Sequence, residues 1–172
     1  MPNLTLAGLN HNAIRVGGRT YTDSFPEAAG QVFKAGELLA IDSAGRCLLF
    51  VAVGSSLDTD GNHVLGFAVE AATGTTDNRV AVEVITGETE ITMPQYNTTA
   101  GTSVTAQTDL DLAYPLINET TGGLMLNINT TTKGIARKIR NAASYDGVKA
   151  TLGDQYGPVV VKVINAARFD QS

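Results

Sequence analysis

Short runs of β-branched and aliphatic residues, separated by turn-forming residues, constrain the fold of this chain more than any other feature. Residues 80–85 place valine at every second position, and residues 159–164 are almost unbroken valine and isoleucine. Clusters of Gly, Asn, Asp, Ser and Thr recur about every 8 to 16 residues between such runs. The sequence therefore predicts an all-β fold, a small β-barrel or sandwich of short antiparallel strands. The valine run predicts a strand that is covered on both faces.

A β-hairpin is expected within residues 32–51. Two apolar runs, 38–41 and 47–51, flank the turn-forming sequence DSAGR. Gly45 in this turn can adopt the positive φ that closes a tight hairpin without a Cβ clash. The hairpin marks the start of the predicted β-barrel or sandwich domain, residues 32–172.

Further strands are expected later in the chain. In residues 64–70, Gly66 indicates a bulge or a close backbone approach. Residues 88–93 are expected to form a short strand that Pro94 ends. Residues 135–143 fit a helix or a strand, and alternating isoleucine and basic residues favour the strand.

Residues 1–31 differ from the rest of the chain, because isolated aliphatic residues are spread among polar residues and glycines. Spaced aliphatic side chains favour packing against a surface over a disordered tail. The prediction is an extended N-terminal arm, with an edge strand and loop of the same domain as the open alternative. The aliphatic residues that would anchor the arm are Leu4, Leu6, Leu9, Ile14 and Val16.

Composition excludes several classes of protein. The 172 residues, 43% of them hydrophobic, suit one domain with a sizeable core, and a net charge of −5 argues against generic nucleic-acid binding. No signal peptide or apolar stretch of about 20 residues is visible, so we expect a soluble chain made in the cytoplasm without a membrane partner. The single cysteine, Cys47, lies in an apolar run and is expected to be a buried, inert thiol.

The sequence lacks the common catalytic and metal-binding motifs. It contains no GxGxxG after a strand, no phosphate-binding loop, no GxSxG, no HExxH and no CxxC. The acidic loop at residues 54–62 is similar to a calcium loop, but Val69 stands where the terminal glutamate ligand belongs. We therefore expect no enzymatic activity and no metal site.

Charge is distributed unevenly along the chain. Residues 57–111 hold nine acidic residues and one arginine, whereas residues 133–168 hold seven basic and two acidic residues. These segments either neutralise each other within one fold or form opposed patches that set contacts between subunits. The candidate subunit-contact charges are Glu83, Glu88, Glu90, Arg137, Lys138 and Arg140.

The order and spacing of several segments resemble the small capsid decoration, or cement, proteins of tailed bacteriophages. The matching segments lie between residues 32 and 164. They are FKAGELLAID at 33–42 with Gly45, LGFAVE at 65–70, residues 82–87, GIARKI at 134–139 and GPVVVKV at 157–163.

The resemblance implies a structural protein of the virion, without catalytic activity or cofactor. Such proteins bind the outer capsid surface, commonly as trimers, and clamp neighbouring major capsid subunits against internal DNA pressure. The implied partners are the major capsid protein and further copies of the chain in a homotrimer, with the N-terminal arm reaching onto the capsid or a neighbour. The Asn/Thr-rich residues 96–132 depart from the family pattern.

Two other functions stay open at this point. The chain fits a head-fibre or host-surface, glycan-binding β-domain, in which residues 96–132 would form the recognition surface and Tyr96 and Tyr114 would stack on sugars. It also fits a self-assembling subunit of a tail or tube.

Overall fold

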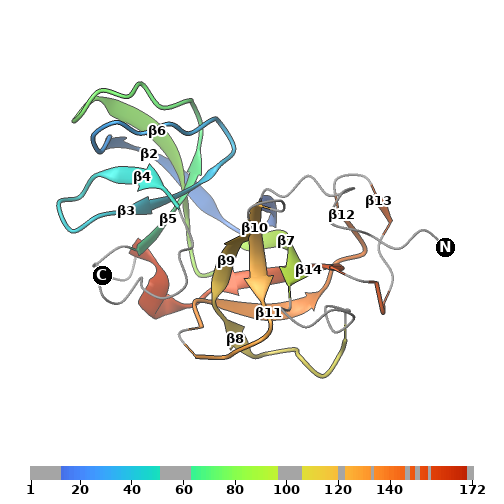
Figure 1. The fold of residues 1–172 in the computed structure, drawn as a ribbon. Coiled ribbons are helices and arrows are strands. Elements are labelled where there is room, and N and C mark those ends of the chain that lie inside the picture. The colour runs from blue at the N-terminus through green and yellow to red at the C-terminus, as the bar shows by residue number, and fades with distance from the viewer. Residues whose placement is uncertain are drawn as a thin grey trace.

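A computed structural model describes residues 13–50, 63–96, 106–119, 123–132, 134–145, 148–149, 152–154 and 156–169. Two large β-sheets dominate these residues, and one short 3-10 helix, η2 (Asn165–Ala167), lies near the C-terminus (Figure 1). The all-β prediction is confirmed. The described strands form a sandwich-like pair of sheets and no closed barrel.

The five-stranded sheet, at the upper left of Figure 1, is antiparallel throughout. Its ends approach each other through a bridge between Glu27 and Cys47, where the Ala28 N–H donates to the Cys47 carbonyl at 3.0 Å. The curled sheet surrounds its own core, which includes Phe25, Leu39 and Leu65. In spatial order the strands are β2 (Thr20–Pro26), β6 (Arg79–Ile85), β5 (His63–Ala68), β3 (Leu38–Ile41) and β4 (Cys47–Leu49).

The predicted hairpin is confirmed as β3 and β4. Gly45 has φ 78° in the turn. The Asp42 carboxylate accepts hydrogen bonds from the backbone N–H groups of Ala44 at 2.9 Å and Arg46 at 2.8 Å. Partial burial alone would raise the pKa of Asp42, but the hydrogen bonds from Arg46 and Ala44 hold it below its ordinary value. The turn is therefore fixed by its own side chains.

Gly66 in β5 is both a bulge and a close approach, as predicted. The pairing with β3 shifts there, since Leu39 lies opposite Gly66 while Ala40 lies opposite Val64. A Cβ at Gly66 would lie 2.0 Å from the Glu83 carbonyl oxygen of β6. Only glycine allows β5 and β6 to lie this close.

The second sheet has seven strands, and β14 (Pro158–Val163) is one of its interior strands. β14 is buried at Val159, Val160, Val161 and Val163, which confirms the prediction of a strand covered on both faces. The neighbours of β14 are β11 (Ala136–Asn141) and β7 (Glu90–Tyr96). β11 confirms the prediction that residues 135–143 contain a strand and not a helix. The remaining strands are β8 (Ala113–Tyr114), β9 (Leu116–Glu119), β10 (Gly123–Asn127) and β1 (Ile14–Gly17), while β12 (Ser144–Tyr145) and β13 (Val148–Lys149) pair with each other.

Pro94 does not end β7, which is a correction to the sequence analysis. Pro94 lies opposite Pro158, next to the pair in which the Gln95 N–H donates to the Gly157 carbonyl. Antiparallel pairs alternate between bonded and non-bonded, so the two prolines form a non-bonded pair that needs no N–H from either residue. On its other edge, β7 pairs with β1 up to Thr92 and with β10 from Gln95, so Pro94 falls in the gap between them.

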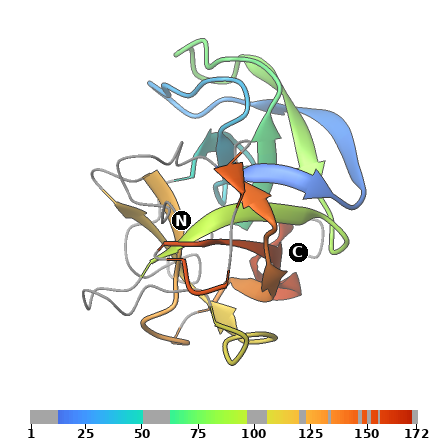
Figure 2. The same cartoon turned by 90° about the vertical axis from the view of Figure 1, so that its right-hand side faces the viewer.

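The two sheets share a second core, and Figure 2 shows one sheet above the other. Leu38, Ala40 and Phe67 of the five-stranded sheet pack there with Ile91 and Val161 of the seven-stranded sheet. Strand β3 therefore has both faces covered. This burial explains why residues 38–41 are apolar without alternation.

Residues 13–31 differ from the predicted arm. β1 pairs with β7, the chain crosses to the other sheet at Gly17 and Gly18, and β2 pairs with β6 over its whole length. Gly18 has φ 79°, and a Cβ there would lie 1.8 Å from the Glu88 carbonyl oxygen. The described part of the arm thus consists of strands belonging to the two sheets, which is the alternative left open above. Residues 1–12, with Leu4, Leu6 and Leu9, lie outside the described residues.

Candidate interaction surface

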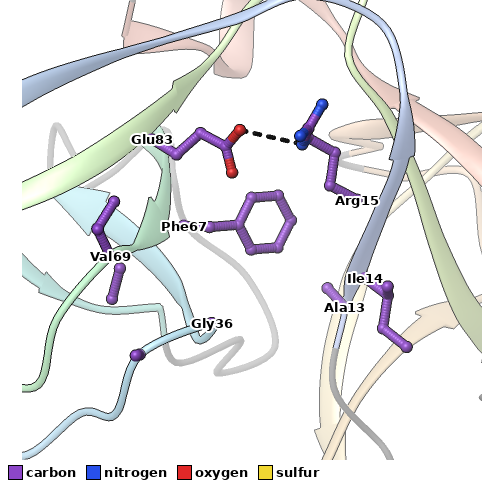
Figure 3. Close-up of a pocket in the computed structure, with 9 residues that line it drawn as sticks. Ala13, Ile14, Arg15, Gly36, Phe67, Val69 and Glu83 are labelled. Atoms are coloured by element: carbon purple, nitrogen blue, oxygen red, sulfur yellow. Dashed lines mark ion pairs between the residues drawn. The ribbon is translucent and has the colours of Figure 1, made fainter.

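An open hollow of about 470 Å³ lies between β1 and the five-stranded sheet. Figure 3 shows the Phe67 ring at its centre, with Val69 on one side and Ile14 on the other. The lining is mostly apolar, and its residues are Ala13, Ile14, Arg15, Ala35, Gly36, Phe67, Ala68, Val69 and Glu83. The hollow offers a recess for an apolar group of a partner.

One carboxylate closes the rim of this hollow. Glu83 Oε1 lies 3.0 Å from Arg15 Nε (Figure 3). The same oxygen accepts a hydrogen bond from Thr20 Oγ1 at 2.7 Å. Arg15 is on β1 and Glu83 on β6, so the ion pair joins the two sheets. Both side chains are partly exposed, which limits the stabilisation to about 1 kcal/mol or less.

Apolar side chains reach solvent around the first two strands. Val16 at the end of β1 is 50% exposed, Tyr21 at the start of β2 is 45% exposed and Val69 at the hollow is 51% exposed. β1 pairs with β7 along one edge, and no strand in the described ranges pairs with its other edge. Two of the predicted arm residues lie on β1. Ile14 lines the hollow, and Val16, two positions later, is half exposed to solvent.

The six candidate subunit-contact charges each take part in an ion pair within the chain. The pairs are Glu83 with Arg15, Glu88 with Arg19, Glu90 with Arg140 and Lys162, Arg137 with Asp111, and Lys138 with Asp109. Four of these pairs, namely those made by Arg137, Lys138, Arg140 and Lys162, link the acidic segment to the basic one. The geometry matches the alternative in which the two segments neutralise each other within one fold.

Lys138 is fully buried, although its charge suggested a surface position. Lys138 lies opposite Val161 and two positions after the buried Ala136, so the ordinary alternation of β11 places it on the core side. The pairing of β11 with β14 shifts only after it, between Lys138 and Arg140. Its Nζ lies 3.2 Å from Gln95 Oε1, 3.2 Å from the Ala106 carbonyl oxygen and 3.4 Å from Asp109 Oδ2. Burial lowers the pKa of Lys138 below its ordinary value, and Asp109 offsets part of this effect.

The sequence analysis missed a buried carboxylate, Glu27. Glu27 Oε2 accepts hydrogen bonds from Thr73 N at 2.9 Å and Thr73 Oγ1 at 2.8 Å, and Oε1 accepts one from Gly74 N at 2.8 Å. Burial alone would raise the pKa of Glu27, but these hydrogen bonds lower it below its ordinary value. The sequence could not predict this site, because Thr73 is 46 residues away from Glu27 and no local pattern links them.

Cys47 is fully buried next to Glu27. Burial, together with the negative charge of Glu27, raises the pKa of the Cys47 thiol to about 11. The thiolate is the reactive form of cysteine, so this thiol is poorly suited to nucleophilic chemistry.

The two tyrosines suggested for sugar stacking have different environments. Tyr114 is buried, and its burial and the nearby Asp109 raise its pKa. Tyr96 is partly buried and stacks on Tyr156, with ring centroids 6.2 Å apart. Only Tyr96 of the two lies at a surface.

Other classes of site can be compared with the part of the chain that the structure describes. These residues contain no group of three or more His, Cys, Asp or Glu side chains that could hold a metal ion. Within the same ranges no helix is long and apolar enough to cross a membrane.

Comparisons with known proteins give no further assignment, since no family model, no curated protein and no solved structure matches this chain.

Proposed function

We propose that this chain is a capsid decoration protein, which binds the outer surface of a tailed-phage capsid and stabilises the head by clamping neighbouring major capsid subunits. The observation that carries the proposal is the apolar surface at the first described strand. Ile14 lines an open hollow there, and Val16 and Val69 are half exposed. Exposed apolar side chains around a recess are typical of protein-binding surfaces.

A decoration protein acts by binding the assembled shell more tightly than the separated subunits. Its binding free energy then adds to the stability of the shell by linkage. Modest affinity per site is sufficient when several sites engage together, and a homotrimer with three copies of the apolar surface would provide such multivalency. The edge of β1 that no described strand pairs with could also accept an extended partner segment by strand addition.

The test uses heads assembled without this protein. We expect the purified full chain to be trimeric by light scattering, to co-sediment with the heads and to raise their melting temperature. Val16→Asp combined with Val69→Asp places charge on the apolar surface and is expected to weaken binding at least tenfold. Leu152→Asp is the matched control, because Leu152 is also an exposed aliphatic residue, at 60%, and does not line the hollow. Failure of the full chain to bind heads would overturn the proposal.

A second candidate function is glycan binding by a head-fibre or host-surface domain. The stacked pair of Tyr96 and Tyr156 favours it, because aromatic faces bind sugar rings. Binding of the full chain to host-cell glycans, lost in Tyr156→Ala and retained in Val16→Asp, would support this function over capsid binding.

A further inference from the structure

Three reactive side chains from separate elements meet inside the seven-stranded sheet. Lys138 comes from β11, Gln95 from β7, and Asp109 from the segment before β8. The Lys138 Nζ lies 3.2 Å from Gln95 Oε1 and 3.4 Å from Asp109 Oδ2. The amine thus lies within hydrogen-bonding distance of both an amide and a carboxylate, in a site that largely excludes water.

The Gln95 amide is in an unfavourable environment. Gln95 is fully buried, and its Nε2 has no hydrogen-bond partner among the residues that the structure describes, while its Oε1 accepts from Lys138. An unsatisfied buried donor destabilises the folded chain, and loss of this NH₂ group would remove the penalty.

Lys138 has the properties of a nucleophile. Its side chain is fully buried, and burial lowers the pKa of its amine. The uncharged amine carries the lone pair needed for attack, so desolvation increases the reactive fraction. The sheet also holds the amine against the amide, which converts a slow bimolecular reaction into an intramolecular one.

We propose that Lys138 and Gln95 form an intramolecular isopeptide bond, with Asp109 transferring the proton. Lys138 Nζ attacks Gln95 Cδ, so that the Nζ–Cδ bond forms and the Cδ–Nε2 bond breaks. The Asp109 carboxylate accepts a proton from Nζ and delivers it to Nε2, which leaves as ammonia. The reaction needs no oxidant, reductant or further reactant.

Asp109 is the less suitable electrophile of the two neighbours. A carboxylate anion repels an attacking lone pair, and its oxygen is a poor leaving group. The Asp109 side chain is also 25% exposed, whereas Gln95 is fully buried. Asp109 therefore suits proton transfer, and Gln95 suits acylation of the lysine.

The bond would tie β7 to β11 across β14, which lies between them. It would also enclose residues 96–137 in a covalent loop, because the linked residues are 43 positions apart. This cross-link would hold the Asn/Thr-rich region to the sheet. The inference is independent of capsid binding, and either can fail without the other.

The test is the intact mass of the denatured full chain, followed by peptide mapping. Loss of ammonia should lower the mass by about 17 Da relative to the sequence, with Lys138 and Gln95 recovered in one branched peptide. An unchanged mass would overturn the proposal. A loss of about 18 Da, with Lys138 joined to Asp109, would overturn the choice of Gln95 as the electrophile.

Variants test the roles of the individual groups. Asp109→Asn removes the proton carrier and is expected to leave most of the folded protein at the unmodified mass, with folding checked by circular dichroism. Lys138→Arg should abolish the mass loss. Lys162→Arg on β14 is the matched control and should keep it, since the Lys162 amine is paired with Glu90. Full cross-linking in Asp109→Asn would overturn the role of Asp109.

Discussion

Arg15 on β1 and Glu83 on β6 form an ion pair, with 3.0 Å between Nε and Oε1, that fastens the seven-stranded sheet to the five-stranded sheet. The same Glu83 oxygen accepts a hydrogen bond from Thr20 Oγ1 on β2. One carboxylate therefore connects the two strands on either side of the crossing at Gly17 and Gly18. It also forms the polar rim of the hollow that we propose as part of the capsid-binding surface.

Glu83→Gln should destabilise the chain modestly, because the ion pair and the hydrogen bond are partly exposed. We expect the free energy of unfolding in urea to fall by about 1 kcal/mol at low salt, with a smaller loss at high salt. Glu88→Gln is the matched control, since its pair with Arg19 is at 3.5 Å and both side chains are mostly exposed. Equal losses in the two variants would contradict a specific role for Glu83.

Gly66→Ala should be severely destabilising. The added Cβ would lie 2.0 Å from the Glu83 carbonyl oxygen, so β5 and β6 would have to separate. We expect a loss of about 4 kcal/mol or more, measured by urea unfolding. Gly45→Ala is the control, because Gly45 has φ 78° but no atom within 4 Å of the added Cβ. That variant should lose only about 1 to 2 kcal/mol, from backbone strain alone.

Glu27 should make the stability of the chain depend on pH in the acidic range. Its folded-state pKa is below its ordinary value, so its contribution is present above the unfolded-state pKa and is lost as pH falls through the folded-state value. Glu27→Gln should lose about 2 kcal/mol near pH 7, because three charge-assisted hydrogen bonds are weakened. The difference between wild type and variant in urea unfolding should shrink below about pH 4. A constant difference at all pH values would contradict ionisation as the cause.

Cys47 should resist thiol reagents in the folded protein. The thiol is fully buried and its pKa is raised to about 11, so little thiolate exists near pH 8. A chromogenic disulfide reagent is expected to label it only after denaturation, at least about a hundredfold faster than in the native state. Rapid labelling of the native chain would contradict the burial of Cys47.

Several features were predictable because they depend on neighbours in the sequence. The period-two valines Val80, Val82 and Val84 face one core, as their spacing requires. The turn before β4 is fixed by Asp42 and Gly45, which lie three positions apart. The position of the apolar hollow could not be predicted, because β1 forms it together with residues from β5, β6 and the segment before β3, which are far from β1 in the sequence.

The sequence alone determined the all-β class, the hairpin and most strand positions, because side-chain alternation and turn chemistry act over a few residues. Only the tertiary structure decided which strands pair and which side chains become buried. The pairing of β11 with β14 places Lys138 opposite the buried Val161, and a non-bonded pairing with Pro158 allows Pro94 within β7. Pairing partners and bulges are selected by packing between segments far apart in the chain, and local preferences do not encode that packing.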